Sequence, residues 1–244
     1  MAQKRPRSGD DAEKGFKKVT PHHLQTLHER DQAKRLIVIL EGASLETIKV
    51  GKQYELLNCD KHKGQMKKYK KNVSQCRPDI THQCLLMLMD SPLNRAGLLQ
   101  VYIHTANNQL IEISPQTRIP RTFERFCGLM VQLLFKLSIA ASDAPNKKLL
   151  KLIKNPVTDH LPTGCKKLCM TFNADRCVKP SELVPAGDTP IVIVVGAIAT
   201  GSIDPDYTEE HLSISNYPLS AALTCTKLCT AFEEAWGVED MVAD

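Results

Sequence analysis

Two unbroken runs of aliphatic residues constrain the fold of this chain more than any other feature. One spans Leu36 to Leu40 and the other spans Ile191 to Val195, far along the 244-residue sequence. A strand without polar alternation is typical of the centre of a parallel sheet, where helices cover both faces. With 42% hydrophobic residues, the chain has enough apolar side chains for a sizeable core. The two runs therefore predict an α/β domain.

Helix and strand patterns alternate along the rest of the chain. We expect helices over residues 81–89, 122–140 and 219–236, and strands over residues 99–104, 110–113, 149–153 and 211–215. Because strands alternate with helices, the sheet should be mainly parallel, with helices flanking it. Residues 35–244 then form a single domain. Residues 1–34 are charged and poor in apolar side chains, so we expect a largely disordered basic tail.

A lysine-rich insert interrupts this pattern near residues 60–76. The lysines are Lys61, Lys63, Lys67, Lys68, Lys70 and Lys71. We expect a solvated loop here. Whether this loop adds contacts to RNA or is simply hydrated stays open at this point.

Charge and targeting features narrow the class of protein. The formal net charge of +5 is modest, and many proteins without a polyanionic partner share it. Met1–Ser8 is basic and polar with no apolar stretch behind it, so we expect no secretory signal. No apolar run approaches the length of a membrane span, and a cytosolic or nuclear protein is expected. The cluster at residues 4–7 is either a nuclear address, a nucleic-acid arm or a solvated tail.

The nine cysteines favour neither disulfides nor a metal site. Their number is odd, a reducing compartment keeps thiols free, and no CxxC pair exists. We therefore expect no metal and thiols that pack like small hydrophobic groups. Hydrolytic motifs such as HExxH and GxSxG are also absent. His82 and His104 are interpreted as packing or hydrogen-bonding residues.

An arginine group marks the entry to the helix expected over residues 122–140. Arg118 and Arg121 precede that helix, and Arg125 lies in its first turn. Cations in the first turn oppose the helix dipole, and acidic residues are the usual choice at this position. Beside free backbone N–H groups, three arginines would form a good phosphate cradle. A solvated turn salt-bridged to Glu124 is the alternative.

Asp79 and Arg77 stand just before the helix over residues 81–89. Asp79 either caps this helix or holds Arg77 in a fixed rotamer for contact with a ligand, and the local sequence alone favours the cap.

A glycine-bearing turn, Gly196 to Gly201, follows the second aliphatic run. It matches neither a phosphate loop nor the dinucleotide GxGxxG pattern. Glycines at the carboxyl end of a parallel strand nevertheless lie where open α/β sheets bind ligands, because the backbone can approach closely there. The passage into the last helix, through Tyr217 and Pro218, supplies more backbone donors nearby.

Together these segments resemble the Nep/Emg family of eukaryotic and archaeal ribosome-biogenesis methyltransferases, in the SPOUT class. The similarity runs in order from about Leu36 to Trp236, and it rests on Leu40–Glu46, Arg77–Gln83, Ser91–Gly97, the arginine helix entry and Ser213–Ala221. The family implies an α/β fold with a C-terminal trefoil knot, a homodimer, and S-adenosyl-L-methionine bound in the knot.

The resemblance also assigns site residues. The implied cofactor site comprises Met170, Gly196, Gly201, Ile214, Ser215, Asn216, Tyr217, Pro218 and Leu219. The implied RNA contacts are Arg77, Arg118, Arg121 and Arg125, with Asp79 positioning Arg77. Asp79 is a conceivable base, but its pairing with Arg77 favours a structural role, so no catalytic base is assigned. Two departures stand out: Thr200 replaces an expected His, and Met170 occupies a position where a small polar residue can occur.

The implied reaction is methylation of N1 of a pseudouridine in small-subunit (18S-type) rRNA, during small ribosomal subunit biogenesis. N1 must lose a proton to become a good nucleophile, and the arginines are expected to hold the flanking phosphates and splay the base toward the cofactor. The implied partner is the pre-ribosomal particle, in the nucleus and nucleolus. The alternatives are a non-catalytic RNA-binding assembly factor and an rRNA ribose 2′-O-methyltransferase.

Overall fold

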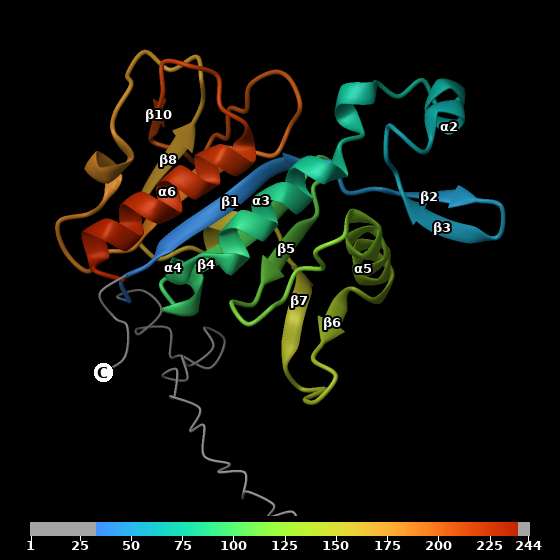
Figure 1. The fold of residues 1–244 in the computed structure, drawn as a ribbon, viewed down its shortest axis with the longest axis horizontal. Helices are drawn as coiled ribbons and strands as arrows, with labels where there is room; N and C mark the ends of the chain where they lie inside the picture. The colour runs from blue at the N-terminus through green and yellow to red at the C-terminus, as the bar shows by residue number, and fades with distance from the viewer. Residues whose placement is uncertain (1–32, 239–244) are drawn as a thin grey trace, which may run out of the picture.

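An eight-stranded sheet forms the centre of the computed structural model, which describes residues 33–238 (Figure 1). The strand order is β10-β8-β9-β1-β4-β5-β7-β6. These strands are β1 (Leu36–Ala43), β4 (Leu99–Thr105), β5 (Leu110–Ile113), β6 (Ser138–Ala140), β7 (Lys148–Ile153), β8 (Lys166–Met170), β9 (Ile191–Gly196) and β10 (Glu210–Leu212). The pairs from β10 to β4 are parallel and those from β4 to β6 are antiparallel. The expected α/β fold is confirmed, with an antiparallel extension. The basic tail over residues 1–32, with the cluster at residues 4–7, lies outside the described residues.

The two aliphatic runs lie side by side in the middle of this sheet. β1 and β9 pair in parallel, with Leu36 opposite Ile191 and Leu40 opposite Val195. Every residue of both runs is at most 3% exposed. Alternate side chains enter different hydrophobic cores on the two faces: Val38 belongs to the larger one and Ile39 to the smaller. Cover on both faces is thus the reason that these strands carry no polar alternation.

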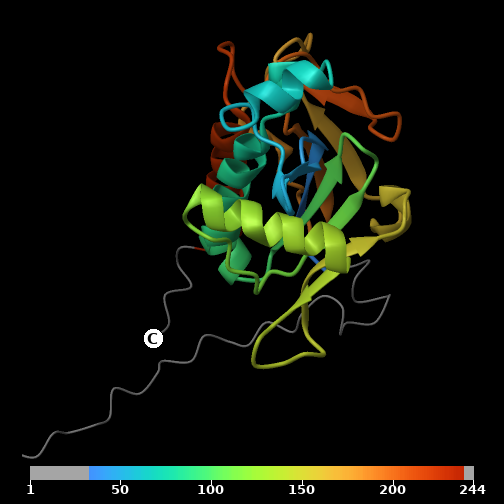
Figure 2. The ribbon, with the colours of Figure 1, turned by 90° about the vertical axis from the view of Figure 1, so that its right-hand side faces the viewer.

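Helices α3 (Pro78–Asp90) and α6 (Ala221–Trp236) pack against each other on one face of the sheet (Figure 1). Further helical segments are α4 (Pro92–Arg95), α5 (Phe123–Lys136), and the 3-10 helices η3 (Val157–His160) and η4 (Pro180–Leu183). Figure 2 shows α5 along its length. Because α3 connects β1 to its parallel neighbour β4, α3 must begin at the carboxyl end of β1. No helix within residues 33–238 is both long and apolar enough to cross a bilayer.

The lysine-rich insert is folded, so the expectation of a solvated loop there is wrong. Between β1 and α3 the chain forms β2 (Thr47–Val50), β3 (Gln53–Leu56), α2 (Lys63–Lys68) and the 3-10 helix η2 (Val73–Gln75). Met66 is 3% exposed and packs with Leu57, Cys59 and Cys76 in a small core of its own. Lysines dominate the local composition of this segment, and its apolar residues are scattered along the sequence. These apolar residues come together only in the folded chain, so the sequence pattern does not indicate a core here.

Other boundaries differ from expectation for local reasons. α5 ends at Lys136 instead of residue 140, because Leu137 adopts a left-handed φ of 61° and the chain then enters β6. The last helix begins at Ala221 instead of residue 219, where Ser220 Oγ accepts a hydrogen bond from the Leu223 N–H at 3.2 Å. Strand β8 escaped prediction, since only its last three residues are apolar.

Candidate active site

A cavity of about 280 Å³ lies at the carboxyl edge of the parallel strands. Three segments form most of it, at residues 170–172 after β8, residues 195–203 after β9 and residues 212–219 after β10. The first turns of α6 close it through Ala221 and Thr224. Because the carboxyl ends of parallel strands meet at one edge of a sheet, segments far apart in the sequence become neighbours here.

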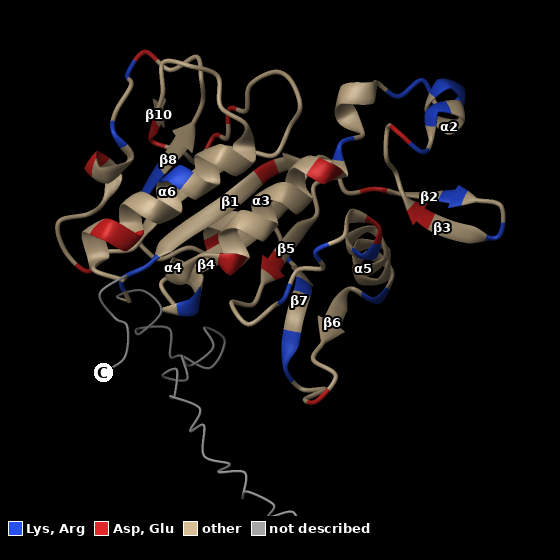
Figure 3. Cartoon of the chain, viewed as in Figure 1, with Lys and Arg blue, Asp and Glu red and all other residues tan. Residues whose placement is uncertain are grey.

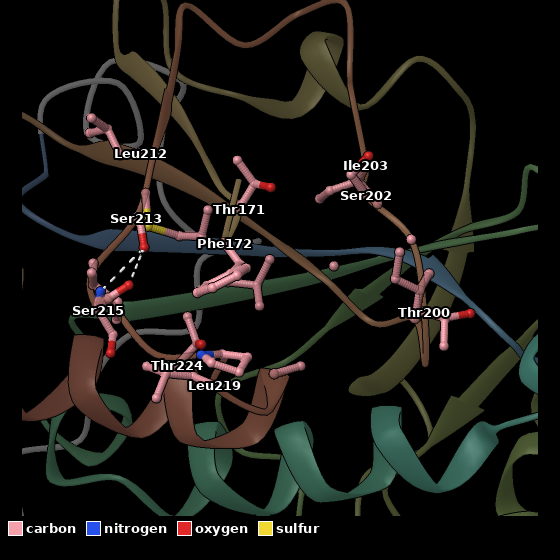
Figure 4. Close-up of a pocket in the computed structure, with 18 of the residues that line it drawn as sticks. Thr171, Phe172, Thr200, Ser202, Ile203, Leu212, Ser213, Ser215, Leu219 and Thr224 are labelled. Atoms are coloured by element: carbon pink, nitrogen blue, oxygen red, sulfur yellow. Dashed lines mark hydrogen bonds between the residues drawn. The ribbon is translucent and has the colours of Figure 1, made fainter. Parts of the chain in front are cut away.

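Most of the residues that the resemblance assigned to the cofactor line this one cavity. They are Met170, Gly196, Gly201, Ile214, Ser215, Tyr217, Pro218 and Leu219. Asn216 is exposed and is not part of the lining. Figure 4 shows Ser213 and Ser215 on one side of the cavity, with Thr200 and Ser202 on the other.

Every residue that lines the cavity is uncharged, and every one lies within residues 33–238. The wall combines aliphatic side chains with backbone groups and the hydroxyls of serine and threonine. Such a cavity admits a ligand with a positive charge without direct repulsion. It recognises the ligand by shape and by hydrogen bonds.

The loop between β10 and α6 is held in shape by its own serine hydroxyls. Ser213 Oγ donates to the carbonyl oxygen of Ser215 at 2.7 Å and accepts from the Ser215 N–H at 3.3 Å (Figure 4). Ser215 Oγ in turn accepts from the Tyr217 N–H at 3.0 Å. These serine turns fix the backbone of this wall before a ligand arrives, which reduces the ordering cost of binding.

A second network braces the wall that follows β9. The Tyr207 hydroxyl donates to Glu41 Oε2 at 3.0 Å, and the other carboxylate oxygen of Glu41 lies 2.6 Å from His104 Nδ1. The hydrogen bond to Glu41 raises the pKa of His104, and burial raises the pKa of Tyr207. A backbone hydrogen bond adds to this network, since the Glu41 carbonyl accepts from the Ala197 N–H at 2.7 Å. The network ties the loop that contains Ile203, a lining residue, to the central strand.

Arg77 and Asp79 form a forked ion pair at the start of α3. Arg77 Nε lies 2.8 Å from Asp79 Oδ1, and Nη2 lies 2.6 Å from Oδ2. This pairing raises the pKa of Arg77. Arg77 is the N-cap residue and no side chain caps the helix, so the capping interpretation of Asp79 is wrong. Asp79 pairs with Arg77 instead, and contact of Arg77 with a ligand stays a prediction. The Arg77 side chain is still 38% exposed.

The other three arginines are exposed: Arg118 and Arg121 on the segment that leads into α5, and Arg125 in the first turn of α5. Arg121 pairs with Asp90, at the far end of α3 from Arg77. Arg118 and Arg125 form no ion pair with any residue between 33 and 238, and the alternative pairing with Glu124 does not occur there. The arginines therefore extend along α3 rather than converging on one point.

His82 holds the arginine segment against α3. Its Nε2 donates to the Pro120 carbonyl at 2.7 Å, and its ring stacks on Phe126 with centroids 4.6 Å apart. Both His82 and His104 thus make structural hydrogen bonds, as the sequence suggested. Thr122 is the N-cap residue of α5, but its side chain makes no capping hydrogen bond.

Most of the thiols are buried, as expected for side chains that pack like small hydrophobic groups. All nine cysteines are free, and seven of them are buried. Within the described residues, no group of His, Cys, Asp and Glu side chains is placed to hold a metal ion.

Comparison with known proteins places the chain in a family. Residues 38–233 match the family described as EMG1/NEP1 methyltransferase. The chain belongs to this family. The human protein named ribosomal RNA small subunit methyltransferase NEP1 is 68% identical over 205 residues, which cover 84% of this chain and 83% of the human one. The Drosophila melanogaster protein of that name is 57% identical over 239 residues, covering 95% and 93%.

A solved EMG1/NEP1 structure has the same fold. The crystal structure of Archaeoglobus fulgidus Nep1 bound to S-adenosylhomocysteine aligns with a TM-score of 0.71 at 26% identity, covering 84% of this chain and 99% of that one. The family resemblance inferred from the sequence is therefore confirmed, and with it the assignment as a methyltransferase.

Sequence reasoning missed part of this EMG1/NEP1 site. Phe172, Ser202 and Thr224 line the cavity, and Glu41 and Tyr207 brace it. The weak apolar signal at the end of β8 was the only local clue to Phe172. Glu41 and Tyr207 are 166 residues apart, so no local pattern links them.

Proposed function

We propose that this chain transfers a methyl group from S-adenosyl-L-methionine to N1 of a pseudouridine in small-subunit rRNA, during small ribosomal subunit biogenesis. One observation carries the proposal: a neutral cavity and the Arg77–Asp79 pair lie at the same edge of the sheet. Family membership, the rRNA methyltransferase names of the relatives, and the S-adenosylhomocysteine in the archaeal structure support it.

The cavity is of small-molecule scale and suits the cofactor in charge. Its volume of about 280 Å³ lies just below the range of roughly 300–1,000 Å³ found for small-molecule sites. The cofactor supplies a methyl group on a positively charged sulfur, and the uncharged lining does not repel it. A Cβ at Gly196 would make only ordinary contacts, 3.5 Å from Ile198 and from Ile203, so crowding by these neighbours does not require glycine there. Gly201 has a φ of 96°, a conformation that other residues rarely adopt.

The chain's own residues bind and align the RNA. α3 begins at the carboxyl end of β1, which is parallel to β8, β9 and β10. Arg77 therefore stands at the edge that carries the cavity. A phosphate held by Arg77, whose guanidinium Asp79 keeps in place, leaves the adjacent base within reach of the cavity. Arg118, Arg121 and Arg125 offer further phosphate contacts along α3.

Alignment rather than proton transfer is the main task that we assign to the protein. The lining contains no carboxylate, imidazole or amine that would act as a base. A site that would hold the sulfonium methyl group close to N1 would lower the barrier without such a group, and the proton that N1 loses would pass to solvent water.

We further propose that the chain works as a homodimer on the pre-ribosomal particle, in the nucleus and nucleolus. The names of the relatives, which refer to small-subunit ribosomal RNA, support this setting. The trefoil knot stays a prediction.

Methyl transfer from labelled S-adenosyl-L-methionine to two matched RNA stem-loops tests the proposal. One carries pseudouridine in the loop and the other uridine. Labelling of the pseudouridine RNA alone is expected. Equal labelling of both would favour ribose methylation, and binding of both without labelling would favour a non-catalytic assembly factor. In the same assay, Arg77→Ala should weaken RNA binding and leave the affinity for S-adenosylhomocysteine unchanged.

A further inference from the structure

The part of the insert that follows β3 carries a charge excess equal to that of the whole chain. Residues 57–76 contain six lysines and a single acidic residue, Asp60, an excess that equals the net charge of +5 of all 244 residues. The rest of the chain is therefore balanced. Figure 3 shows this concentration of blue on α2 and on the connection between α2 and α3.

Two of these lysines anchor the insert to the rest of the protein. Lys61 Nζ lies 2.7 Å from Glu55 Oε2 on β3, and Lys71 pairs with Glu46, just before β2. Both lysines thus have carboxylate partners and a structural task.

The remaining four lysines have no such task. Lys63, Lys67, Lys68 and Lys70 are exposed, and none pairs with a carboxylate among residues 33–238. Lys63 and Lys67 are four residues apart on α2, where like charges repel and destabilise a helix. The small core under Met66 holds this charged face rigid.

An aromatic ring lies within the basic face. The Tyr69 ring is 58% exposed, and Lys68 Nζ lies 5.5 Å from its centroid. Exposed aromatic rings between basic side chains are typical of surfaces that bind single-stranded nucleic acid, where bases stack on the ring and phosphates meet the cations.

The insert is attached to both segments that carry the arginines. The Cys59 N–H donates to the Cys76 carbonyl at 2.9 Å, which closes the insert directly before Arg77. On its other side, β3 packs against α5 through Tyr54 and Phe135, whose ring centroids are 4.8 Å apart. The insert is therefore fixed between the two segments that carry the arginines.

We propose that the face formed by Lys63, Lys67, Lys68, Tyr69 and Lys70, here called the insert face, binds single-stranded RNA that flanks the target loop. This inference rests on the proposed function, because it extends the same RNA site. The arginines hold the loop, and the insert face holds the strand that leaves it.

The test uses the full chain and two RNAs, a pseudouridine stem-loop alone and the same stem-loop with single-stranded extensions. The variant carries K63Q, K67Q and K70Q, and the matched control carries K147Q, K148Q and K151Q, at the antiparallel end of the sheet. Dissociation constants are measured at several salt concentrations. Unfolding midpoints in urea show whether each variant keeps its stability.

On the extended RNA, the insert variant is expected to bind roughly tenfold more weakly, and the slope of log K against log salt should fall by about 0.7 for each lost phosphate contact. On the stem-loop alone, the insert variant, the control variant and the unmodified chain should agree. Tyr69→Ala should weaken binding of the extended RNA and leave the salt slope unchanged, because stacking involves no counterion release.

Two results would overturn the proposal. Unchanged affinity and slope on the extended RNA would show that the insert face does not bind the flanking RNA. Equal weakening on both RNAs would show a general electrostatic effect. Methylation of the stem-loop by the unmodified chain is measured separately, so failure of this inference is distinguishable from failure of the proposed function.

Discussion

Replacing Gly42 by alanine is expected to deform the cavity without altering any lining residue. Gly42 lies near the end of β1 with a φ of 71°, and a Cβ there would sit 2.8 Å from Ile198 Cγ2. Ile198 lines the cavity. The added methyl group must therefore push this wall or move the end of the central strand.

The size of the effect follows from two separate costs. A left-handed conformation costs a residue other than glycine about 1–2 kcal/mol. Forcing an extra methyl group into a packed interior costs about 1–3 kcal/mol. The free energy of unfolding should therefore fall by roughly 2–5 kcal/mol, a large part of the total of about 5–15 kcal/mol that is usual for a domain.

Gly51 provides a matched control. It has a φ of 62°, and a Cβ there would meet no atom within 4 Å. Gly51→Ala should therefore show the conformational cost alone. The difference between the two variants then measures the contact with Ile198.

Urea unfolding followed by the fluorescence of Trp236, the single tryptophan of the chain, gives the two free energies. Calorimetric titration with S-adenosylhomocysteine gives the affinity of the cavity. Gly42→Ala should bind more weakly and Gly51→Ala should bind as the unmodified chain does. If both variants lost the same free energy of unfolding, or if Gly42→Ala bound with full affinity, the steric argument would be refuted.

Three further outcomes are expected. The hydrogen bond to Glu41 raises the pKa of His104, so the pair stabilises the folded chain fully below the ordinary pKa of about 6.5 and loses this effect as pH rises through the raised pKa. His104→Gln should therefore flatten the dependence of the free energy of unfolding on pH. An unchanged dependence on pH would count against the His104–Glu41 pair. Tyr207→Phe removes a hydrogen bond to a carboxylate and should cost about 1.5–3 kcal/mol in urea unfolding, with weaker binding of S-adenosylhomocysteine; full affinity would show that the cavity does not need this brace. A thiol reagent should label the exposed Cys177 in the folded chain, whereas burial raises the pKa of Cys229 to about 12, so its rapid labelling without denaturant would contradict the structure.

Much of the architecture follows from the amino-acid sequence by itself. The aliphatic runs at residues 36–40 and 191–195 predict buried parallel strands, because only a strand covered on both faces carries no polar alternation. The hairpin of β4 and β5 and the helices α3 and α6 follow from equally local patterns. Most of the cofactor residues assigned by similarity to the EMG1/NEP1 family do line the cavity, although residue types and spacing alone marked only its glycine turn and the approach to the last helix.

Tertiary structure alone decided how distant residues meet. Met66 is surrounded by lysines, yet it is buried in the small core of the insert. The link between Glu41 and Tyr207 depends on strand order. The physical reason is the same in each case: periodicity and capping depend on neighbours along the chain, whereas strand order and side-chain pairing depend on packing between segments far apart in sequence.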